Sequence, residues 1–370
     1  MRVTIERSAF LKALTHVQSV VERRNTIPIL SNVLMQAGSG QLKLTATDLD
    51  IEIVESVPAD VAKPGATTVP AHMIYDIVRK LPDGAQLELE QAGDGQRVSI
   101  FAGRSRFALQ ALPHEDFPDL AAGDFPHRFA ITASDLKGLI EKTRFAISTE
   151  ETRYYLNGIY FHDVAAGGLL RAVATDGHRL AQAQIPRPDG AKGMPGVIVP
   201  RKTVLEVVKL FEGIDGAVEV SLSAAKIRFA AGDLVLTSKL IDGTFPDYER
   251  VIPRNNDKKL ELDTRTFAQA VDRVSTISQE KGRAVKLAIG ANKVVLTVNN
   301  PDSGSAEEEV ACSYDADPLD IGFNSRYLLD VAGQMKSDGM ELQLADAGSP
   351  TIVRDPTDEQ ALYVLMPMRV

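Results

Sequence analysis

Several common features are scarce in this sequence, and each absence argues against a class of protein. Cys312 is the only cysteine, so the chain can form neither an intrachain disulfide nor a cysteine-ligated metal cluster. Tryptophan is absent, and no apolar run approaches the ~18 residues that cross a membrane. The first residues lack the apolar core of a secretory signal. We therefore expect a cytoplasmic protein without a membrane segment, with Cys312 in a core.

Signatures of catalysis and of bound cofactors are also scarce. The six histidines are scattered, with no pair at a metal-site spacing, and the glycine-rich segments 165–168 and 303–305 lack the lysine and helix of a phosphate-binding loop. Neither a metal nor a cofactor is predicted. Asp176 and His178 resemble an acid–base pair, but no nucleophile motif accompanies them. A turn aspartate that binds its own backbone is the favoured interpretation, and an enzyme that uses this pair is the alternative.

The chain does contain a threefold repeat of one helical pattern. Copies occupy residues 69–81, 199–211 and 323–335, and each has apolar residues at the i, i+3, i+4, i+7 spacing of a helix with one buried face. Successive copies are separated by close to one third of the 370 residues. A period of this length is typical of domains rather than of a solenoid. Three similar domains are therefore predicted.

A second helical pattern and a set of alternating runs recur at the same interval. The second pattern covers residues 8–14, 134–140 and 264–271, and its candidate N-caps are Ser8, Ser134 and Asp263 or Thr264. Period-two runs predict strands around residues 42–46, 87–89, 98–100, 107–111, 218–222 and 294–298. Each domain is expected to contain a helix, strands, a second helix and further strands. The predicted class is α+β, with domains at 1–125, 126–252 and 253–370.

Charge is divided unevenly between the predicted helices and the rest of the chain. The formal net charge is −9. The helical windows 8–24, 69–81, 134–144, 199–211, 264–276 and 323–336 hold 15 Lys and Arg against 7 Asp and Glu, whereas the remainder holds 26 against 43. Basic helices in an acidic protein favour one surface that faces a polyanion. Ordinary scatter of surface charge is the alternative.

Five short motifs lie in order on this repeat and carry a resemblance. They are RYYLNG at 153–158, ATDGHRL at 174–180, VPRK at 199–202, FPDY at 245–248 and MPMR at 366–369. With them, the chain resembles over its whole length the bacterial sliding clamp family, the beta subunit of DNA polymerase III. The resemblance implies the DNA-clamp fold, in which each domain packs two helices on antiparallel sheets. It also implies a head-to-tail dimeric ring, in which phosphate contacts to the encircled duplex carry no sequence information.

The resemblance further implies one hydrophobic groove per protomer, between the second and third domains. Short linear motifs of the replicative polymerase alpha subunit, the clamp loader, other DNA polymerases and repair proteins would bind there. Methionines near the C-terminus suit a surface that accepts different peptides, although the residues alone favour a last core strand for Met366 to Met368. The groove residues implied are Leu156, Thr175, Gly177, His178, Arg179, Leu180, Pro246, Arg250, Val251, Val364, Met366, Pro367, Met368 and Arg369.

Contact with double-stranded DNA is the second implication. Candidate side chains lie on the predicted helices and in the tyrosine pair, of which one member is expected in a core. They are Arg24, Arg79, Lys80, Lys137, Tyr154, Tyr155, Arg201, Lys202 and Lys209. Glu150 and Glu151 precede the tyrosines in a loop that the family brings near DNA, and two acids there would weaken the contact.

Ring closure is the third implication. Residues 104–109 alternate basic and apolar side chains, as expected of an edge strand that pairs with a partner chain. The alternative is a strand inside the first domain with Phe107 and Leu109 in its core. The interface residues implied are Arg97, Arg104, Arg106, Phe107, Leu109, Ile277, Glu307, Glu308 and Glu309. The sequence therefore predicts a non-catalytic processivity clamp of DNA replication, cytoplasmic and nucleoid-associated; a peptide-binding ring that never meets DNA is a third hypothesis.

Overall fold

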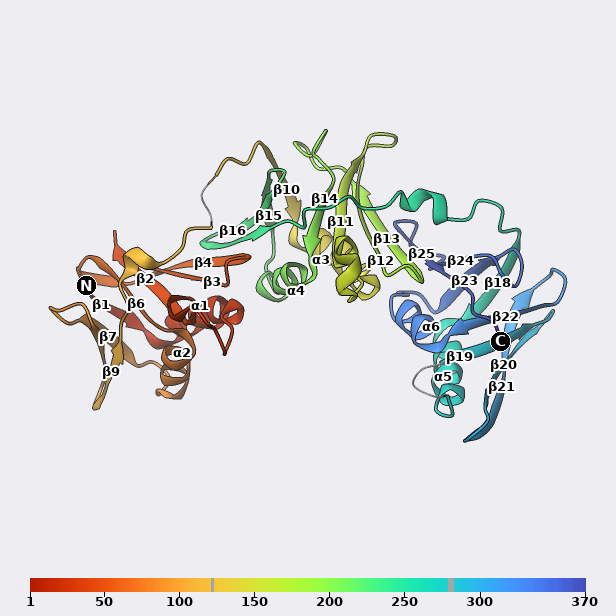
Figure 1. Cartoon of the computed structure of the whole chain (residues 1–370), viewed down its shortest axis with the longest axis horizontal. Coiled ribbons are helices and arrows are strands. Elements are labelled where there is room, and N and C mark those ends of the chain that lie inside the picture. Colours follow the sequence, from red (N-terminus) through yellow and green to blue (C-terminus); the bar gives the residue numbers. More distant parts are fainter. Residues whose placement is uncertain (121–122, 279–282) are drawn as a thin grey trace. The chain divides into compact units, whose positions relative to one another are not determined.

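The computed structural model describes residues 1–120, 123–278 and 283–370 (Figure 1). Its contacts divide the chain into two compact units. The first unit contains Met1–Ser134, Pro188–Ala191 and Lys202–Leu240, and the second contains Asp135–Arg187, Lys192–Arg201 and Ile241–Val370. The central third of the chain therefore contributes to both units.

The described residues form six α-helices, one in each window that the helical pattern predicts, although α1 and α3 begin one residue before theirs. The pattern at 69–81, 199–211 and 323–335 starts too early, because the first residues of each copy belong to a preceding strand. The bounds are Arg7–Val17 (α1), Ala71–Lys80 (α2), Ala133–Glu141 (α3), Arg201–Leu210 (α4), Thr264–Ser275 (α5) and Ser325–Ala332 (α6). Short 3₁₀ turns cover Gln18–Val20 (η1), Pro28–Ser31 (η2), His114–Asp116 (η3), Arg144–Ala146 (η4), Glu151–Leu156 (η5) and Tyr248–Val251 (η6).

The helix N-termini follow the capping expectation in one case out of three. Asp263 caps α5, because its carboxylate accepts the N–H of Thr266 at 2.7 Å. Ser8 does not cap α1: the carboxylate of Glu6 accepts the N–H of Ala9 at 3.0 Å, and Ser8 donates to Glu6 from inside the first turn. Ser134 likewise lies inside α3, which begins at Ala133. Both helices begin directly after a strand, so the first helical residue comes earlier in the chain than the serine that was expected to cap it.

A strand precedes the first helix of each repeat, so the predicted order is wrong at its first element. The three strands are Arg2–Glu6 (β1), His127–Thr132 (β10) and Lys258–Asp263 (β18). In β1 only Val3 and Ile5 are buried. Two alternating positions are too few to separate a strand from the helical pattern that follows.

The first unit contains two antiparallel sheets. Their strand orders are β5-β1-β7-β8-β9 and β10-β15-β16-β17-β4-β3-β2-β6. Helices α1 and α2 lie side by side, and α1 packs on β3 and β4 (Figure 1). The further strands are Asn32–Gly38 (β2), Gln41–Thr47 (β3), Ile51–Pro58 (β4), Asp60–Lys63 (β5), Gly65–Pro70 (β6), Gln86–Gln91 (β7), Arg97–Ala102 (β8), Ser105–Gln110 (β9), Ala217–Leu222 (β15), Lys226–Ala231 (β16) and Leu234–Lys239 (β17).

The second unit contains one long antiparallel sheet, of order β14-β11-β12-β13-β25-β24-β23-β18-β21-β20-β19-β22. Helix α5 packs on α6, β20 and β21. The strands are Gly158–Val164 (β11), Leu169–Thr175 (β12), Arg179–Pro186 (β13), Val197–Pro200 (β14), Ala284–Ile289 (β19), Lys293–Asn300 (β20), Gly304–Tyr314 (β21), Leu319–Asn324 (β22), Gly339–Leu344 (β23), Thr351–Arg354 (β24) and Ala361–Leu365 (β25).

Sheet pairing continues from one repeat into the next. In the first unit β4 pairs with β17, and in the second unit β13 pairs with β25. All six predicted strand regions are strands in the structure. Cys312, predicted in a core, is only half-buried: it lies on β21 between the buried Val310 and Tyr314, and partial burial raises the pKa of its thiol. None of the described helices has the length and hydropathy to cross a membrane.

Candidate functional site

An apolar hollow of about 310 Å³ opens in the second unit, where four segments of the chain meet. Its floor belongs to a buried cluster that includes Leu156, Leu180 and Val364. Two apolar side chains stand at its surface, Met366 with 40% and Val251 with 49% of their area exposed. The lining consists of Arg153, Tyr155, Leu156, Thr175, Gly177, Arg179, Leu180, Pro246, Asp247, Tyr248, Val251, Val364 and Met366. We call this hollow the groove.

Nine of the fourteen residues implied for the groove line it in the structure, and five do not. His178 lines a neighbouring polar hollow, Arg250 is exposed and pairs with Asp247 at 2.6 Å, and Pro367, Met368 and Arg369 line a separate hollow at the C-terminus. Four lining residues were not among the fourteen: Arg153, Tyr155, Asp247 and Tyr248. All four stand in the motifs at 153–158 and 245–248, so the motifs were the signal that could have found them.

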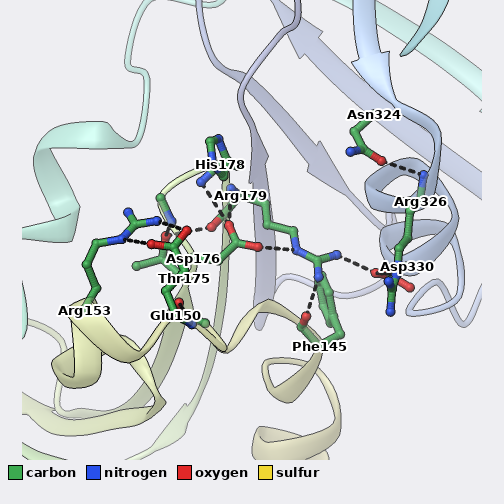
Figure 2. Close-up of polar contacts among 12 residues, drawn as sticks. Phe145, Glu150, Arg153, Thr175, Asp176, His178, Arg179, Asn324, Arg326 and Asp330 are labelled. Atoms are coloured by element: carbon green, nitrogen blue, oxygen red, sulfur yellow. Dashed lines mark hydrogen bonds and ion pairs between the residues drawn. The ribbon is translucent and has the colours of Figure 1, made fainter. Parts of the chain in front are cut away.

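The turn between β12 and β13 forms one wall of the groove. The Asp176 carboxylate accepts the backbone N–H groups of His178 and Arg179 at 2.9 and 3.0 Å, and Thr175 Oγ1 accepts that of Gly177 at 3.1 Å. Gly177 has φ +88°, which favours glycine. Figure 2 shows Asp176 directed at this backbone. Its contacts are those of a turn cap, as the sequence favoured, and its hydrogen bond with His178 is to the backbone N–H rather than to the imidazole.

Arg179 connects this wall to helix α6 and to Phe145 (Figure 2). Its guanidinium donates to Asp176 at 3.1 Å, to Asp330 on α6 at 2.5 Å and to the carbonyl oxygen of Phe145 at 2.7 Å, and it lies 4.3 Å from the ring centroid of Tyr327. The residue is only 8% exposed. A cation this buried is tolerated because each face is matched by an acceptor or a ring. Arg179 therefore positions the groove wall.

Tyr248 forms part of the groove floor, and its hydroxyl is fixed from two sides. Arg171 Nη1 donates to the hydroxyl oxygen at 2.9 Å, and His162 Nε2 lies 2.9 Å away on the other side. Burial of the ring lowers the pKa of His162, which favours the neutral imidazole. Because Nδ1 faces the carbonyl oxygen of Asp163, Nε2 accepts a hydrogen bond from the tyrosine hydroxyl. Tyr160 stacks on both His162 and Phe245 with centroids 4.8 Å apart. The floor is therefore rigid.

The candidate DNA-binding side chains differ in how freely they are displayed. Tyr154 is 53% exposed, whereas Tyr155 packs against the groove cluster, so one of the pair faces inward as predicted. Lys137 is half-buried and lies near Glu141. All the remaining candidates except Tyr155 are exposed. Arg79, Lys202 and Lys209 pair with acids in their own unit. In the described part of the chain Arg24, Lys80 and Arg201 have no ion-pair partner. Glu150 holds Arg153 through contacts of 2.7 and 2.8 Å.

The candidate interface residues lie at two strand edges. Strand β9 is the end strand of its sheet, as residues 104–109 predicted, with Arg104 in the preceding turn. Leu109 is buried, while Phe107 is half-buried and lines a hollow of about 630 Å³ with Met73. Residues 304–311 of β21 pair with β20 on one side, and β18 covers the other side only at 312–314. Glu308 pairs with Arg273 and Glu309 with Lys293, both within the unit.

Three family models match successive parts of the chain. They describe the N-terminal domain of the DNA polymerase III beta subunit at residues 1–121, its central domain at 130–247 and its C-terminal domain at 249–369. The chain belongs to the DNA polymerase III beta subunit family. The predicted α+β fold of three clamp domains is confirmed, whereas the boundaries proposed at 125 and 252 stay a prediction.

Full-length relatives agree with this family. The chain is 57% identical to the beta sliding clamp of Caulobacter vibrioides over 372 residues and 41% identical to that of Escherichia coli K12 over 373, with 100% of each chain covered. Its structure is similar to that of the DnaN sliding clamp of Bartonella birtlesii bound to griselimycin, with 57% identity, TM-score 0.97 and 100% coverage of both chains. The function is that of a sliding clamp, an accessory subunit that gives DNA polymerase III processivity and is not an enzyme.

The described residues contain no group of three or more histidine, cysteine or acidic side chains that could hold a metal ion.

Proposed function

We propose that this chain acts as a head-to-tail homodimeric ring that encircles duplex DNA without regard to sequence and tethers its partners through the groove. The groove is the observation that carries the proposal. Its buried floor is rigid, while Met366 and Val251 expose apolar surface at its rim. A concave apolar site with a few fixed polar groups is the usual form of a peptide-binding pocket.

The occupants of the groove are short linear motifs. They belong to the replicative polymerase alpha subunit, the clamp loader, other DNA polymerases and repair proteins. Relatives from Bartonella birtlesii and Pseudomonas aeruginosa have been solved bound to griselimycin, which makes this compound a suitable probe. The flexible side chain of Met366 adapts to different apolar ligands.

The two open strand edges support closure of the ring. Strand β9 of one protomer pairs with residues 304–311 of its partner's β21, which satisfies N–H and C=O groups that a lone protomer leaves open. Phe107 then meets the partner's Ile277. Arg97, Arg104 and Arg106 face the acidic run Glu307, Glu308 and Glu309 of the partner, in which Glu307 is the acid without an ion pair in the described residues. Because the contact joins different surfaces, closure after two copies gives a ring.

The DNA surface consists of the exposed basic side chains together with Tyr154. Contacts of this kind act on phosphates, so they hold the duplex without fixing its position. The protein is cytoplasmic and associated with the nucleoid. Each protomer contributes three domains, with boundaries near residues 125 and 252.

Calorimetric titration with griselimycin tests the groove. The unmodified protein is expected to bind about one molecule per chain, and the rim variants Met366→Gln and Val251→Gln are expected to bind at least about tenfold more weakly. Leu205→Gln is the matched control, because Leu205 is also 40% exposed but lies on α4 outside the groove. Equal binding by all four proteins would remove the groove from the proposal.

Retention on DNA tests the ring. Protein loaded by the clamp loader is expected to stay on a nicked circular plasmid and to leave after the plasmid is linearised. Rapid loss from the circle would contradict encirclement. Equal retention on circular and linear DNA would indicate ordinary surface binding instead.

A further inference from the structure

The last residues of the chain run from the groove to β22, the strand at one end of the long sheet. Strand β25 ends at Leu365, and the N–H of Met366 then donates to the carbonyl oxygen of His178 at 3.0 Å. Two residues later the N–H of Met368 donates to the carbonyl oxygen of Gly322 at 2.8 Å. Met366 is thus held on both sides by backbone hydrogen bonds, one at the groove and one at β22. We call residues 367–370 the tail.

Gly322 lies where the tail crosses β22, the end strand of the sheet. A Cβ atom at this position would collide with Cγ1 of Val370 and would lie 2.7 Å from the carbonyl oxygen of Met368 and 2.9 Å from Cγ2 of Val370. Real Cβ atoms essentially never approach other atoms this closely. The nearest atoms all belong to the tail, so a side chain here would act on the tail before any other part of the fold.

The backbone of Gly322 does not itself require glycine. Its φ is outside the left-handed region that the other glycines of turns occupy, and it sits in a regular strand paired with β19. Glycine inside a strand weakens the strand and often marks a close approach of another segment. Here that segment is the tail, which covers the open edge of β22.

We propose that Gly322 is a positioning residue for the groove: it seats the tail and thereby fixes Met366 at the groove rim. This inference rests on the proposed function of the groove. Pro367 between the two hydrogen-bonded residues has no N–H and a fixed φ, so it transmits the position of Met368 to Met366 with little slack. A peptide that meets a seated Met366 does not lose affinity to the ordering of the chain around it.

Replacing Gly322 with alanine tests the proposed contact between the tail and Gly322, which we call the seat, without changing a residue that lines the groove. Gly322→Ala is expected to weaken griselimycin binding about three- to tenfold in calorimetry, the cost of ordering roughly one residue. Gly348→Ala is the matched control, because Gly348 lines the same C-terminal hollow but its Cβ would meet only the Asp346 carboxylate at an ordinary 3.7 Å. The control is expected to bind as the unmodified protein does.

Two further readouts separate positioning from a general loss of structure. Carboxypeptidase Y should release Val370 faster from Gly322→Ala than from Gly348→Ala, measured by intact mass. The ¹³C-methyl NMR signals of Met366 and Met368 should shift in the Gly322 variant, while its unfolding midpoint stays that of the control. Should Gly322→Ala fail to fold, Val370→Gly removes the side chain that lies against Gly322 and is expected to show the same weaker binding and the same shift of the Met366 and Met368 signals.

The outcomes distinguish the seat from the groove. If the unmodified protein binds griselimycin, Met366→Gln weakens it and Gly322→Ala matches Gly348→Ala, the seat is wrong and the groove stands. If the unmodified protein does not bind, or Met366→Gln binds equally well, the groove itself is wrong. Weaker binding by Gly322→Ala with unchanged tail release and unchanged methionine signals would also overturn the seat.

Discussion

Arg179 and Asp330 form an ion pair with 2.5 Å between Nη1 and Oδ2, although they are 151 positions apart in the chain. The pair ties the start of β13, which carries the groove wall, to helix α6. Asp330 is partly exposed, whereas Arg179 is almost completely buried. The geometry of the groove therefore depends on an ion pair with helix α6, which does not line the groove.

Removal of the buried cation should be costly. Arg179→Met removes the closest cation from the carboxylates of Asp176 and Asp330, and we expect the free energy of unfolding to fall by about 3 to 5 kcal/mol. Urea unfolding followed by circular dichroism measures it. Arg326→Met is the control, because Arg326 lies on α6, is exposed and stands 3.9 Å from the same Asp330. Its expected effect is within about 0.5 kcal/mol, as for most surface pairs. Similar losses in the two variants would show that Arg179 does not hold the wall.

Charges placed in the apolar contact between protomers should open the ring. In Phe107→Asp and Ile277→Asp the new carboxylate would have to be buried against an apolar partner, which costs several kcal/mol. Light scattering should report a mass near the 40.1 kDa of one chain for each variant. Ile27→Asp is the control, since Ile27 is 46% exposed and outside the predicted interface. A dimeric mass in both interface variants would place the contact elsewhere.

The acids ahead of the tyrosine pair should reduce the hold on DNA. The double variant Glu150→Gln, Glu151→Gln removes two negative charges and frees Arg153 from its paired carboxylate. We expect a higher salt concentration for release from nicked circular DNA, and a salt slope steeper by about one phosphate contact. Glu115→Gln is the control, because Glu115 is an exposed acid outside this loop. It should leave the release concentration and the salt slope unchanged. Unchanged release by the double variant would mean that this loop does not approach the duplex.

Asp355 should make part of the stability depend on pH. Burial alone would raise the pKa of this carboxyl, but hydrogen bonds from Ser337 and Thr357 outweigh it and hold the pKa well below its usual range. A lowered folded-state pKa contributes stability above the unfolded value of about 3.9, and the contribution is lost as pH falls toward the folded value.

Substitution of Asp355 should therefore cost more at neutral pH than in acid. We expect Asp355→Ala to lower the free energy of unfolding by about 2 to 4 kcal/mol at pH 7, and by roughly 1 kcal/mol less at pH 3. Urea titrations at the two pH values measure the difference. The exposed Asp315→Ala should change little at either pH. An equal loss at both pH values would contradict the role assigned to the hydrogen bonds.

The repeating patterns of the chain predicted its helices and six of its strands, and the five short motifs carried the resemblance to its family. The pattern of a helix with one apolar face, like that of an alternating strand, involves residues only a few positions apart. The sequence of residues 264–271 or 293–300 is therefore enough to predict the element found there. The short strands that precede the helices were not predicted in this way. In β1 two buried positions, Val3 and Ile5, do not establish a period, and the N-cap of α1 consequently fell on Glu6 rather than on Ser8.

The site itself needed the tertiary structure, because its parts are brought together by pairing over long distances. The motifs named most of the groove, yet they did not reveal that Tyr248 is fixed by His162 and Arg171, that Arg179 is buried, or that Pro367 to Arg369 leave the groove. Pairing between strands far apart in the chain, such as β13 with β25, brings these side chains together, and no local pattern encodes that pairing. Local periodicity in the sequence determined the helices and the strands it predicted, and the five motifs indicated the family. Long-range packing alone decided which side chains meet, including the tail against Gly322.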